Sequence, residues 1–353
     1  GDDGGANRCH RAARKPVCPM TADFESRCQA LVVELGLGNA DDIQSIESLT
    51  GGVASDIGKV VLAGKTICIK FALSKLKVAQ DWRAPVHRNA AEYQWLRTAS
   101  RVAPNMAPQL YGHSKTHHGF AMEYLEGNDV YLWKTALLQG RQPFGEAGRV
   151  ADVVGQIHAA SAQPDLDRSP FQNRDDFDDL RIDPYLRFTA ARHPEVADQI
   201  MAVADAIYAN DTVLVHGDVS PKNIMISGGA PIILDAECAT MGDPSFDVAF
   251  CLNHLVLKAF HMPQMRTALR AELAAFWAGY ARHIDWQDTG DLNRSVATLL
   301  PMLMLARVDG KSPVEYLDSS SADHVRTVAL QLITTPPATL DDVIDHIFQT
   351  LEG

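Results

Sequence analysis

The chain has 353 residues, of which 22% are charged and 46% hydrophobic, and its formal net charge is −12. A single hydrophobic core stops growing at roughly 250 to 300 residues, so this length predicts two compact units. The acidic balance argues against nonspecific nucleic-acid binding, and no apolar run approaches the roughly 18 residues that predict a membrane-spanning helix. Six cysteines without a CxxC pair fit a reduced, cytoplasmic protein better than a zinc site or a disulfide framework.

The first 125 residues predict a tail followed by an antiparallel sheet. Residues 1–20 show no apolar periodicity, and we expect a disordered tail or a remnant of expression there. Period-2 apolar segments separated by glycine turns are typical of antiparallel strands, and apolar residues at helical spacing predict helices. In chain order we expect a helix at 23–35, strands at 43–49, 57–62 and 67–71, a helix at 88–98, and strands at 109–112 and 120–124.

The pattern changes near residue 126, which we take as the boundary between units at 21–125 and 126–353. The second unit is predicted to be mostly helical. One interruption, at 213–237, contains short apolar runs that we expect to be strands placing polar groups at one edge of the helices. Helices are expected at 149–160, 195–208, 247–260, 266–281, 292–308, 322–332 and 340–351.

The polar residues of this interruption have the spacing expected for phosphoryl transfer. Asp218 ends a His-Gly-Asp sequence, Asn223 comes five residues later, and Asp235 and Glu237 follow the next apolar run. Phosphoryl transfer requires a positioned hydroxyl nucleophile and neutralised phosphates. The Asp218 carboxylate can accept the hydroxyl proton, while Asn223 and Asp235 offer the oxygen ligands that Mg²⁺ prefers. A merely solvated polar edge is disfavoured, because converging buried acidic groups are costly without a metal or partners.

Two sequences, HGDVSPKN at 216–223 and DAECATMGDPSFDVAF at 235–250, resemble motifs of the aminoglycoside phosphotransferase and choline kinase superfamily. Gly217 stands where protein kinases usually have arginine, which is this superfamily's habit. Asp247 matches the downstream aspartate that braces its catalytic loop. The DxE pair is most similar to that of 5-methylthioribose kinases, whereas Asn223 is typical of aminoglycoside kinases, so both subgroups stay open.

This resemblance implies an α+β, bilobal protein-kinase-like fold, with a five-stranded antiparallel sheet and a helix in the N-terminal lobe and a mostly helical C-terminal lobe. It assigns nucleotide binding to 21–125, and catalysis and substrate binding to 126–353. The implied activity is an ATP-dependent transfer of the γ-phosphate to a hydroxyl of a small molecule, with Mg²⁺. Asp218 is then catalytic and Asp247 structural, and the metal ligands are Asn223, Asp235 and Glu237.

The resemblance also implies nucleotide-binding residues upstream. Lys70 ends the third predicted strand, where the superfamily has a lysine that contacts the α- and β-phosphates. Glu92 lies in the following helix and is expected to orient Lys70. Met122 to Leu125 falls where the lobes join, and its backbone, including Glu123 and Leu125, is expected to pair with the adenine edge.

The loop between the first two strands falls where these enzymes cover the phosphates. Gly51 and Gly52 permit close backbone approach to a phosphate, and Ser55 can donate a hydroxyl. The alternative is a plain hairpin turn without a binding role. Lys222, four residues after Asp218, is expected near the transferred phosphate, with an ordinary surface lysine as the alternative.

The sequence indicates the substrate-binding residues less clearly than the nucleotide-binding ones. Arg307 ends a predicted helix and loosely resembles a late arginine with which methylthioribose kinases approach their substrate. The aspartates at 175–179 could attract a cationic substrate such as an aminoglycoside, although we favour a solvated loop, since charge runs usually face water.

We therefore expect a hydroxylated small molecule as the partner, and neither nucleic acid nor a membrane. The alternative is a nucleotide-binding pseudokinase or regulatory protein of the same fold. That alternative predicts the loss of Asp218, Asn223, Asp235 or Lys70, and all four are present. A protein kinase is disfavoured because the segment at 235–247 is too short for a long activation loop.

Overall fold

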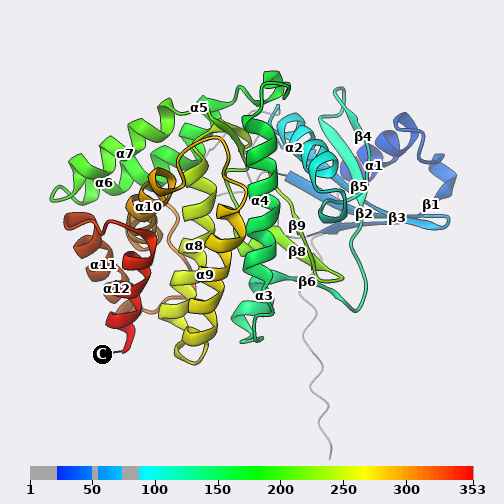
Figure 1. Ribbon diagram of the computed structural model, residues 1–353. Helices are drawn as coiled ribbons and strands as arrows, with labels where there is room; N and C mark the ends of the chain where they lie inside the picture. The colour runs from blue at the N-terminus through cyan, green and yellow to red at the C-terminus, as the bar shows by residue number, and fades with distance from the viewer. Residues whose placement is uncertain (1–21, 50–54, 74–86, 353) are drawn as a thin grey trace, which may run out of the picture.

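The computed structural model describes residues 22–49, 55–73 and 87–352. The tail predicted at 1–20 lies outside these residues. Figure 1 shows the sheet, with α1 (Ala22–Glu34) and α2 (Arg88–Val102), at one end of the molecule and the longer helices at the other, with α4 (Glu146–Ala162) between them. The predicted α+β fold class is confirmed. None of the described helices is long and apolar enough to cross a membrane.

The predicted five-stranded sheet is present, and all its neighbouring strands are antiparallel. The strands are paired in the order β1-β2-β3-β5-β4. Helices α1 and α2 pack against different parts of this sheet. Residues of α1 form a small hydrophobic core with the sheet, whereas residues of α2 belong to the large hydrophobic core that continues into the helical part. The strand bounds are β1 (Ile43–Leu49), β2 (Ser55–Leu62), β3 (Lys65–Ala72), β4 (Leu110–Ser114) and β5 (Gly119–Glu123).

Strand β3 sends alternate side chains to these two cores. Ile69 and Phe71 belong to the small core under α1, whereas Cys68 belongs to the large core. Successive strand residues point to opposite faces. Lys70, between Ile69 and Phe71, is therefore turned to the face of Cys68 and towards Glu92 of α2, whose carboxylate lies 2.8 Å from the lysine nitrogen. The pleat of one strand thus places the lysine.

The remaining helices confirm the predicted helical half, most of them extending a few residues beyond the predicted ends. Helix α8 is buried over nearly its whole length. It begins with Pro244, and the Asp243 side chain caps it by accepting a hydrogen bond from the Ser245 amide at 2.8 Å. The bounds are α7 (Ala197–Ala209), α8 (Pro244–His261), α9 (Arg266–Ala281), α10 (Thr289–Asp309), α11 (Ser319–Thr334) and α12 (Leu340–Glu352).

Short strands form two small sheets beside α4 and α8. One has the order β6-β8-β9 and the other pairs β10 with β7. The predicted strands at 213–237 are three of these, and they bring the His-Gly-Asp sequence, Asn223 and Asp235 to adjacent strand ends. The bounds are β6 (Val130–Leu132), β7 (Val213–Val215), β8 (Ile224–Ser227), β9 (Ala230–Ile233) and β10 (Thr240–Gly242).

The prediction of a solvated loop around the aspartates at 175–179 is wrong, because this segment is helical. It comprises α5 (Arg174–Phe177), a π-helix (Asp178–Arg187) and α6 (Phe188–Arg192). Its acidic residues and Pro184 disfavour a helix locally. Phe177, Ile182 and Leu186 are nevertheless buried in the large core, so tertiary packing decides the conformation. The sequence also did not predict β6 and α3 (Trp133–Leu138).

Helices α4 and α9 cross at two glycines, which makes this contact sensitive to an added methyl group. A Cβ at Gly279 would lie 2.6 Å from the carbonyl oxygen of Gly148, and that backbone oxygen cannot move aside cheaply. We expect Gly279→Ala to lower the free energy of unfolding by about 1–3 kcal/mol through overpacking. Urea unfolding measures this change. The control is Ala278→Ser on the exposed side of α9, and an equal stability of the two variants would contradict the packing argument.

Candidate active site

The loop that carries Asp218 follows β7 and ends at Asn223, immediately before β8. Gly217 has φ +80°, and a Cβ there would lie 2.9 Å from Cβ of Cys238, so both the turn and the close approach require glycine. The Asn223 side-chain amide donates to the Asp218 carbonyl at 3.1 Å. This bond closes the loop and leaves the side-chain oxygen of Asn223 available as a ligand.

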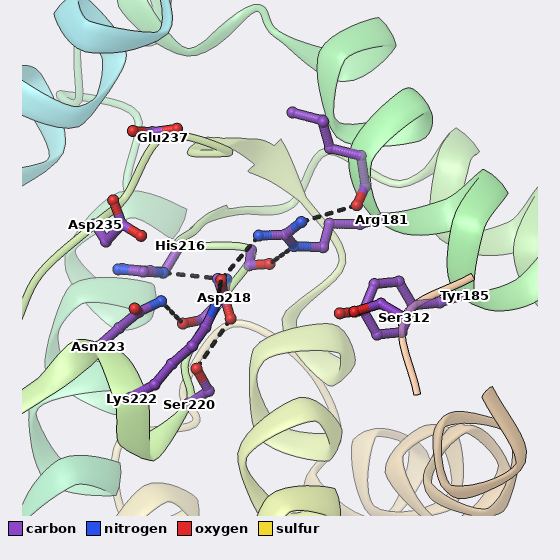
Figure 2. Close-up of polar contacts among 12 residues, drawn as sticks. Arg181, Tyr185, His216, Asp218, Ser220, Lys222, Asn223, Asp235, Glu237 and Ser312 are labelled. Atoms are coloured by element: carbon purple, nitrogen blue, oxygen red, sulfur yellow. Dashed lines mark hydrogen bonds and ion pairs between the residues drawn. The ribbon is translucent and has the colours of Figure 1, made fainter. Parts of the chain in front are cut away.

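The Asp218 carboxylate, in a residue only 4% exposed, is surrounded by donors. Arg181 and Lys222 each approach the same oxygen to 3.0 Å, and the Ser220 hydroxyl donates to the other at 3.0 Å (Figure 2). Burial raises the pKa of Asp218, but the attraction of Lys222 and Arg181 outweighs it and lowers the pKa below its ordinary value. Asp218 is therefore ionised at neutral pH.

Asp247, at the start of α8, holds this loop in place by hydrogen bonds. Its two carboxylate oxygens accept hydrogen bonds from the backbone amides of His216 at 2.7 Å and Gly217 at 2.8 Å. His158 of α4 contacts it at 3.2 Å and also bonds to the Tyr280 hydroxyl at 2.8 Å. His158 is thus a buried, hydrogen-bonded histidine of the core, with Asp247 as one of its partners.

Lys70 lies at the centre of three carboxylates and is only 2% exposed. Its ammonium group pairs with Glu92 at 2.8 Å, with Glu237 at 3.2 Å, and closely with Asp235. Burial raises the pKa of Glu92 to about 8, and Asp235 and Glu237 add to this effect, while Lys70 opposes it. Burial lowers the pKa of Lys70, but its three partners outweigh burial and raise it well above its ordinary value.

Asp235 and Asn223 are suited to hold a divalent metal. Asp235 has φ +68°, a conformation unusual for a residue other than glycine, and its side chain is 41% exposed. Burial raises its pKa, but Lys70 and Lys222 outweigh burial and keep it ionised. Glu92, Asp235 and Glu237 present oxygens within 4.8 Å of one another. These converging oxygens, with the partly exposed carboxylate of Asp235 among them, are of the kind that a divalent cation prefers, so such a cation fits this place.

A cavity of about 390 Å³ opens beside this cluster. Lys70, Glu92, Lys222, Asn223 and Asp235 lie in its polar wall, and Met122 to Leu125 also line it. The rest of the wall is apolar, as expected for a planar base, and consists of Leu49, Ile57, Cys68, Pro108, Leu132, Met225 and Leu234.

A second cavity, of about 220 Å³, lies against Asp218 and between helices of the C-terminal half. Lys222 lies in the wall of both cavities, whereas Asp218 and Arg307 line only the second. Figure 2 shows Asp235 and Glu237 on one side of Asp218, and Tyr185 and Ser312, which the second cavity touches, on the other. The two cavities therefore meet at the Asp218 loop.

The structure describes only part of the loop that was predicted to cover the phosphates. Gly51 and Gly52 lie outside the described residues. Ser55 donates its hydroxyl to Glu237, which Lys70 also contacts. The Glu123 carboxylate accepts a hydrogen bond from the Gln109 backbone amide at 3.1 Å, and Glu123 and Leu125 both line the first cavity.

Sequence reasoning missed Arg181. This residue lies in the segment predicted as a solvated loop, and it donates to the Gly217 carbonyl as well as to Asp218. Arg181 lies in an acidic stretch 37 positions before Asp218. No apolar periodicity there indicated that its side chain would face Asp218. Only the packing of the π-helix against the catalytic loop turns it towards Asp218.

Comparison with known proteins decides the family. The model of the "Phosphotransferase enzyme family" matches residues 69–288, more than half of the chain, and this region includes Lys70, Asp218 and Asp247. The chain belongs to this family.

Among curated proteins, this phosphotransferase-family chain is 22% identical over 265 residues to a methylthioribose kinase of Bacillus cereus, covering 67% of the chain and 63% of the relative. It is 24% identical over 232 residues to a methylthioribose kinase of Escherichia coli, covering 56% of the chain and 54% of the relative. The match thus spans less than two thirds of either relative.

Solved structures bear out the fold of this phosphotransferase-family chain. An amicoumacin kinase, hAmiN, in complex with AMP-PNP, Ca²⁺ and Ami, has a TM-score of 0.53 and 11% identity, covering 91% of this chain and 98% of that one. A choline/ethanolamine kinase family protein from Mesorhizobium loti has a TM-score of 0.51 and 17% identity, covering 94% and 99%. The expected bilobal protein-kinase-like fold is confirmed.

The contacts of Asp247 predict a strong dependence of stability on this carboxylate. In Asp247→Asn one acceptor oxygen becomes a donor, so a buried backbone amide loses its partner and His158 loses its charged neighbour. We expect the free energy of unfolding to fall by about 2–4 kcal/mol. Guanidinium unfolding gives this value, with Asp211→Asn, whose side chain is 66% exposed, as the matched control. A loss no larger than that of the control would refute the bracing role.

Proposed function

We propose that this protein is an ATP-dependent phosphotransferase that moves the γ-phosphate of ATP to a hydroxyl group of a small molecule. One observation carries this proposal: two cavities of different character meet at the buried, ionised Asp218. One cavity has an apolar wall and a lysine-carboxylate cluster, which suits a nucleotide. The other is open to Asp218 and has room for an acceptor.

In the first cavity, the apolar residues enclose adenine, and the backbone of Glu123 and Leu125 pairs with the edge of the adenine ring. Lys70, held by Glu92, contacts the α- and β-phosphates, and its buried position fixes the ammonium group without competition from water. The lobe at 21–125 then binds the nucleotide, and the lobe at 126–353 supplies catalysis and the acceptor site.

Asn223 and Asp235 are the residues we assign to Mg²⁺, because both offer oxygen atoms to the first cavity. When bound, the metal neutralises charge on the phosphate oxygens. Glu237 is held by Ser55, Lys70 and Arg88 and positions this cluster. The solved amicoumacin kinase complex, with AMP-PNP and Ca²⁺, supports the use of a nucleotide with a divalent metal.

Asp218 orients the acceptor hydroxyl and takes its proton. The hydroxyl oxygen forms a bond to the γ-phosphorus, the bond between that phosphorus and the oxygen bridging to the β-phosphate breaks, and ADP leaves. Lys222, in the wall of both cavities, is placed to neutralise the transferred phosphate as its charge shifts. Arg181 and Lys222 keep Asp218 ionised, so it is ready to accept the proton late in the reaction.

The relatives named methylthioribose kinase support a small-molecule acceptor. The pseudokinase alternative is disfavoured, because Lys70, Asp218, Asn223 and Asp235 are all present and are gathered around two adjoining cavities. The buried free thiols of Cys28, Cys68, Cys238 and Cys251 fit a reducing, cytoplasmic location in which ATP is available.

The proposal is tested first by ADP release from ATP and Mg²⁺ in the presence of hydroxylated small molecules. We expect Asp218→Asn to lower turnover by about 10²- to 10⁴-fold, because the amide cannot accept the hydroxyl proton. Nucleotide affinity, measured by calorimetry, should not change, since Asp218 lies outside the nucleotide cavity. Asp205→Asn, whose side chain is 71% exposed, is the control. Undiminished turnover in Asp218→Asn would rule out its catalytic role.

A second variant tests the metal assignment. In Asp235→Asn the ligand loses its charge, so we expect the affinity for ATP in the presence of Mg²⁺ to fall by about 10- to 100-fold. Affinity in EDTA should stay the same or rise, because one negative charge near the phosphates is gone. Calorimetric titrations under both conditions separate the two effects. Equal losses with and without Mg²⁺ would mean that Asp235 does not act through a metal.

A further inference from the structure

The cavity beside Asp218 has an excess of positive charge. Among the described residues of its wall, Glu315 supplies the one carboxylate besides Asp218, whereas four side chains are cationic, those of Lys134, Lys222, Lys258 and Arg307. Two of these cations are paired: Lys134 with Glu315 at 2.6 Å and Lys222 with Asp218 at 3.0 Å. Within the part of the chain that the structure describes, the other two have no carboxylate partner.

Lys258 of α8 is the more unusual of these two. It is 1% exposed, and within the described part of the chain its ammonium group makes one hydrogen bond, to the backbone carbonyl of His254 at 3.2 Å. The Tyr316 ring, with its centroid 5.2 Å away, adds only a weak attraction. Burial, with the charges of Lys134 and Arg307, lowers the pKa of Lys258 to about 7. An amine with unused hydrogen-bonding capacity is thus held in the wall of a polar cavity, where a bound anion would favour its charged form.

Arg307 of α10 is 9% exposed. Like Lys258, it has hydrogen-bond donors that are not all used within the described structure. All its hydrogen bonds come from one terminal nitrogen, which donates to the Tyr185 hydroxyl at 3.3 Å, to the Ser312 hydroxyl at 3.2 Å and to the Ser312 carbonyl. Its Nε and the Tyr316 hydroxyl are buried without a partner in the described structure. A guanidinium with free donors suits a carboxylate or a phosphate.

The acidic residues that could favour a cationic substrate are elsewhere. None of the aspartates at 175–179 lines this cavity, and Asp176 and Asp178 are occupied by His87 and Arg187. His254, in the cavity wall, stays neutral because burial lowers its pKa well below the ordinary value, with Lys258 adding to the effect. The volume of about 220 Å³ lies below the roughly 300–1,000 Å³ typical of drug-sized ligands. The cavity suits a small acceptor better than an aminoglycoside.

We propose that the phosphate acceptor is a small hydroxylated anion, whose carboxylate or phosphate group is bound by Lys258 and Arg307 while its hydroxyl lies at Asp218. This proposal rests on the phosphotransferase function and specifies its substrate class. Charge complementarity carries it: buried, unpaired cations are costly, and an anionic ligand supplies the missing partner. The assignment extends the predicted substrate contact of Arg307 and adds Lys258, which the sequence did not indicate.

The first test uses acceptors in matched pairs that differ in one charge. Glycerate is compared with glyceramide, and ribose 5-phosphate with ribose, by ADP release with Mg²⁺ and ATP. We expect turnover to be confined to a charged member, and the pair that responds distinguishes carboxylate from phosphate. Lys258→Met, which keeps an unbranched side chain but removes the amine, should raise KM for that acceptor by about 10- to 100-fold. Lys311→Met, at a lysine 49% exposed, is the matched control and should leave KM unchanged.

The second test does not depend on turnover. With AMP-PNP and Mg²⁺ present to fill the nucleotide cavity, malonate or inorganic phosphate should raise the unfolding temperature of the wild type. The increase should be lost in Lys258→Met and in Arg307→Gln, and kept in Lys311→Met. Arg307→Gln serves if Lys258→Met does not fold. Equal increases in all variants overturn the anion site. ADP formation with neutral or amine-bearing acceptors that depends on Asp218 also overturns it, while leaving the phosphotransferase function intact.

Discussion

The carboxylate of Asp247 is the constraint on which the candidate site depends. It holds two successive backbone amides of the loop after β7, and those bonds set the direction in which Asp218 points. Because α8 is buried over nearly all of its length, its first turn cannot shift without disturbing the large core. The position of Asp218 is therefore tied to a helix that is packed on all sides. His158 and Tyr280 extend this support into α4 and α9.

The two cavities that meet at this loop have different electrostatic character. Around Lys70, three carboxyl groups converge on one ammonium group and present oxygens that suit a metal ion along with the nucleotide. Beside Asp218, cations outnumber carboxylates, and Lys258 and Arg307 are left without a charged partner in the described structure. Lys222 lies in the wall of both cavities. Buried basic groups without a partner beside Asp218 cost stability in the free protein, and a bound anion would relieve that cost.

Helices from distant parts of the chain converge on the second cavity. Lys258 comes from α8, Arg307 from α10, and Tyr185 and Arg181 from the π-helix before α6. The π-helix is a conformation found frequently at functional sites. In this protein it directs Arg181 to Asp218 and Tyr185 to Arg307, so one irregular element contributes to both the Asp218 surroundings and the second cavity.

The amino-acid sequence by itself determined what depends on local spacing. The alternation of β3 turns Lys70 to one face, the short distance from Asp218 to Asn223 closes the loop, and the apolar run before Asp235 brings it beside them. Only the tertiary structure decided the rest. Arg181 follows a stretch whose charge favours a loop, yet buried Phe177, Ile182 and Leu186 make it helical. Lys258 reads as an ordinary lysine near a helix end, because its lack of a counter-ion depends on which side chains from other elements surround it. Pairing and burial of charge are properties of the packed molecule, and no local pattern encodes them.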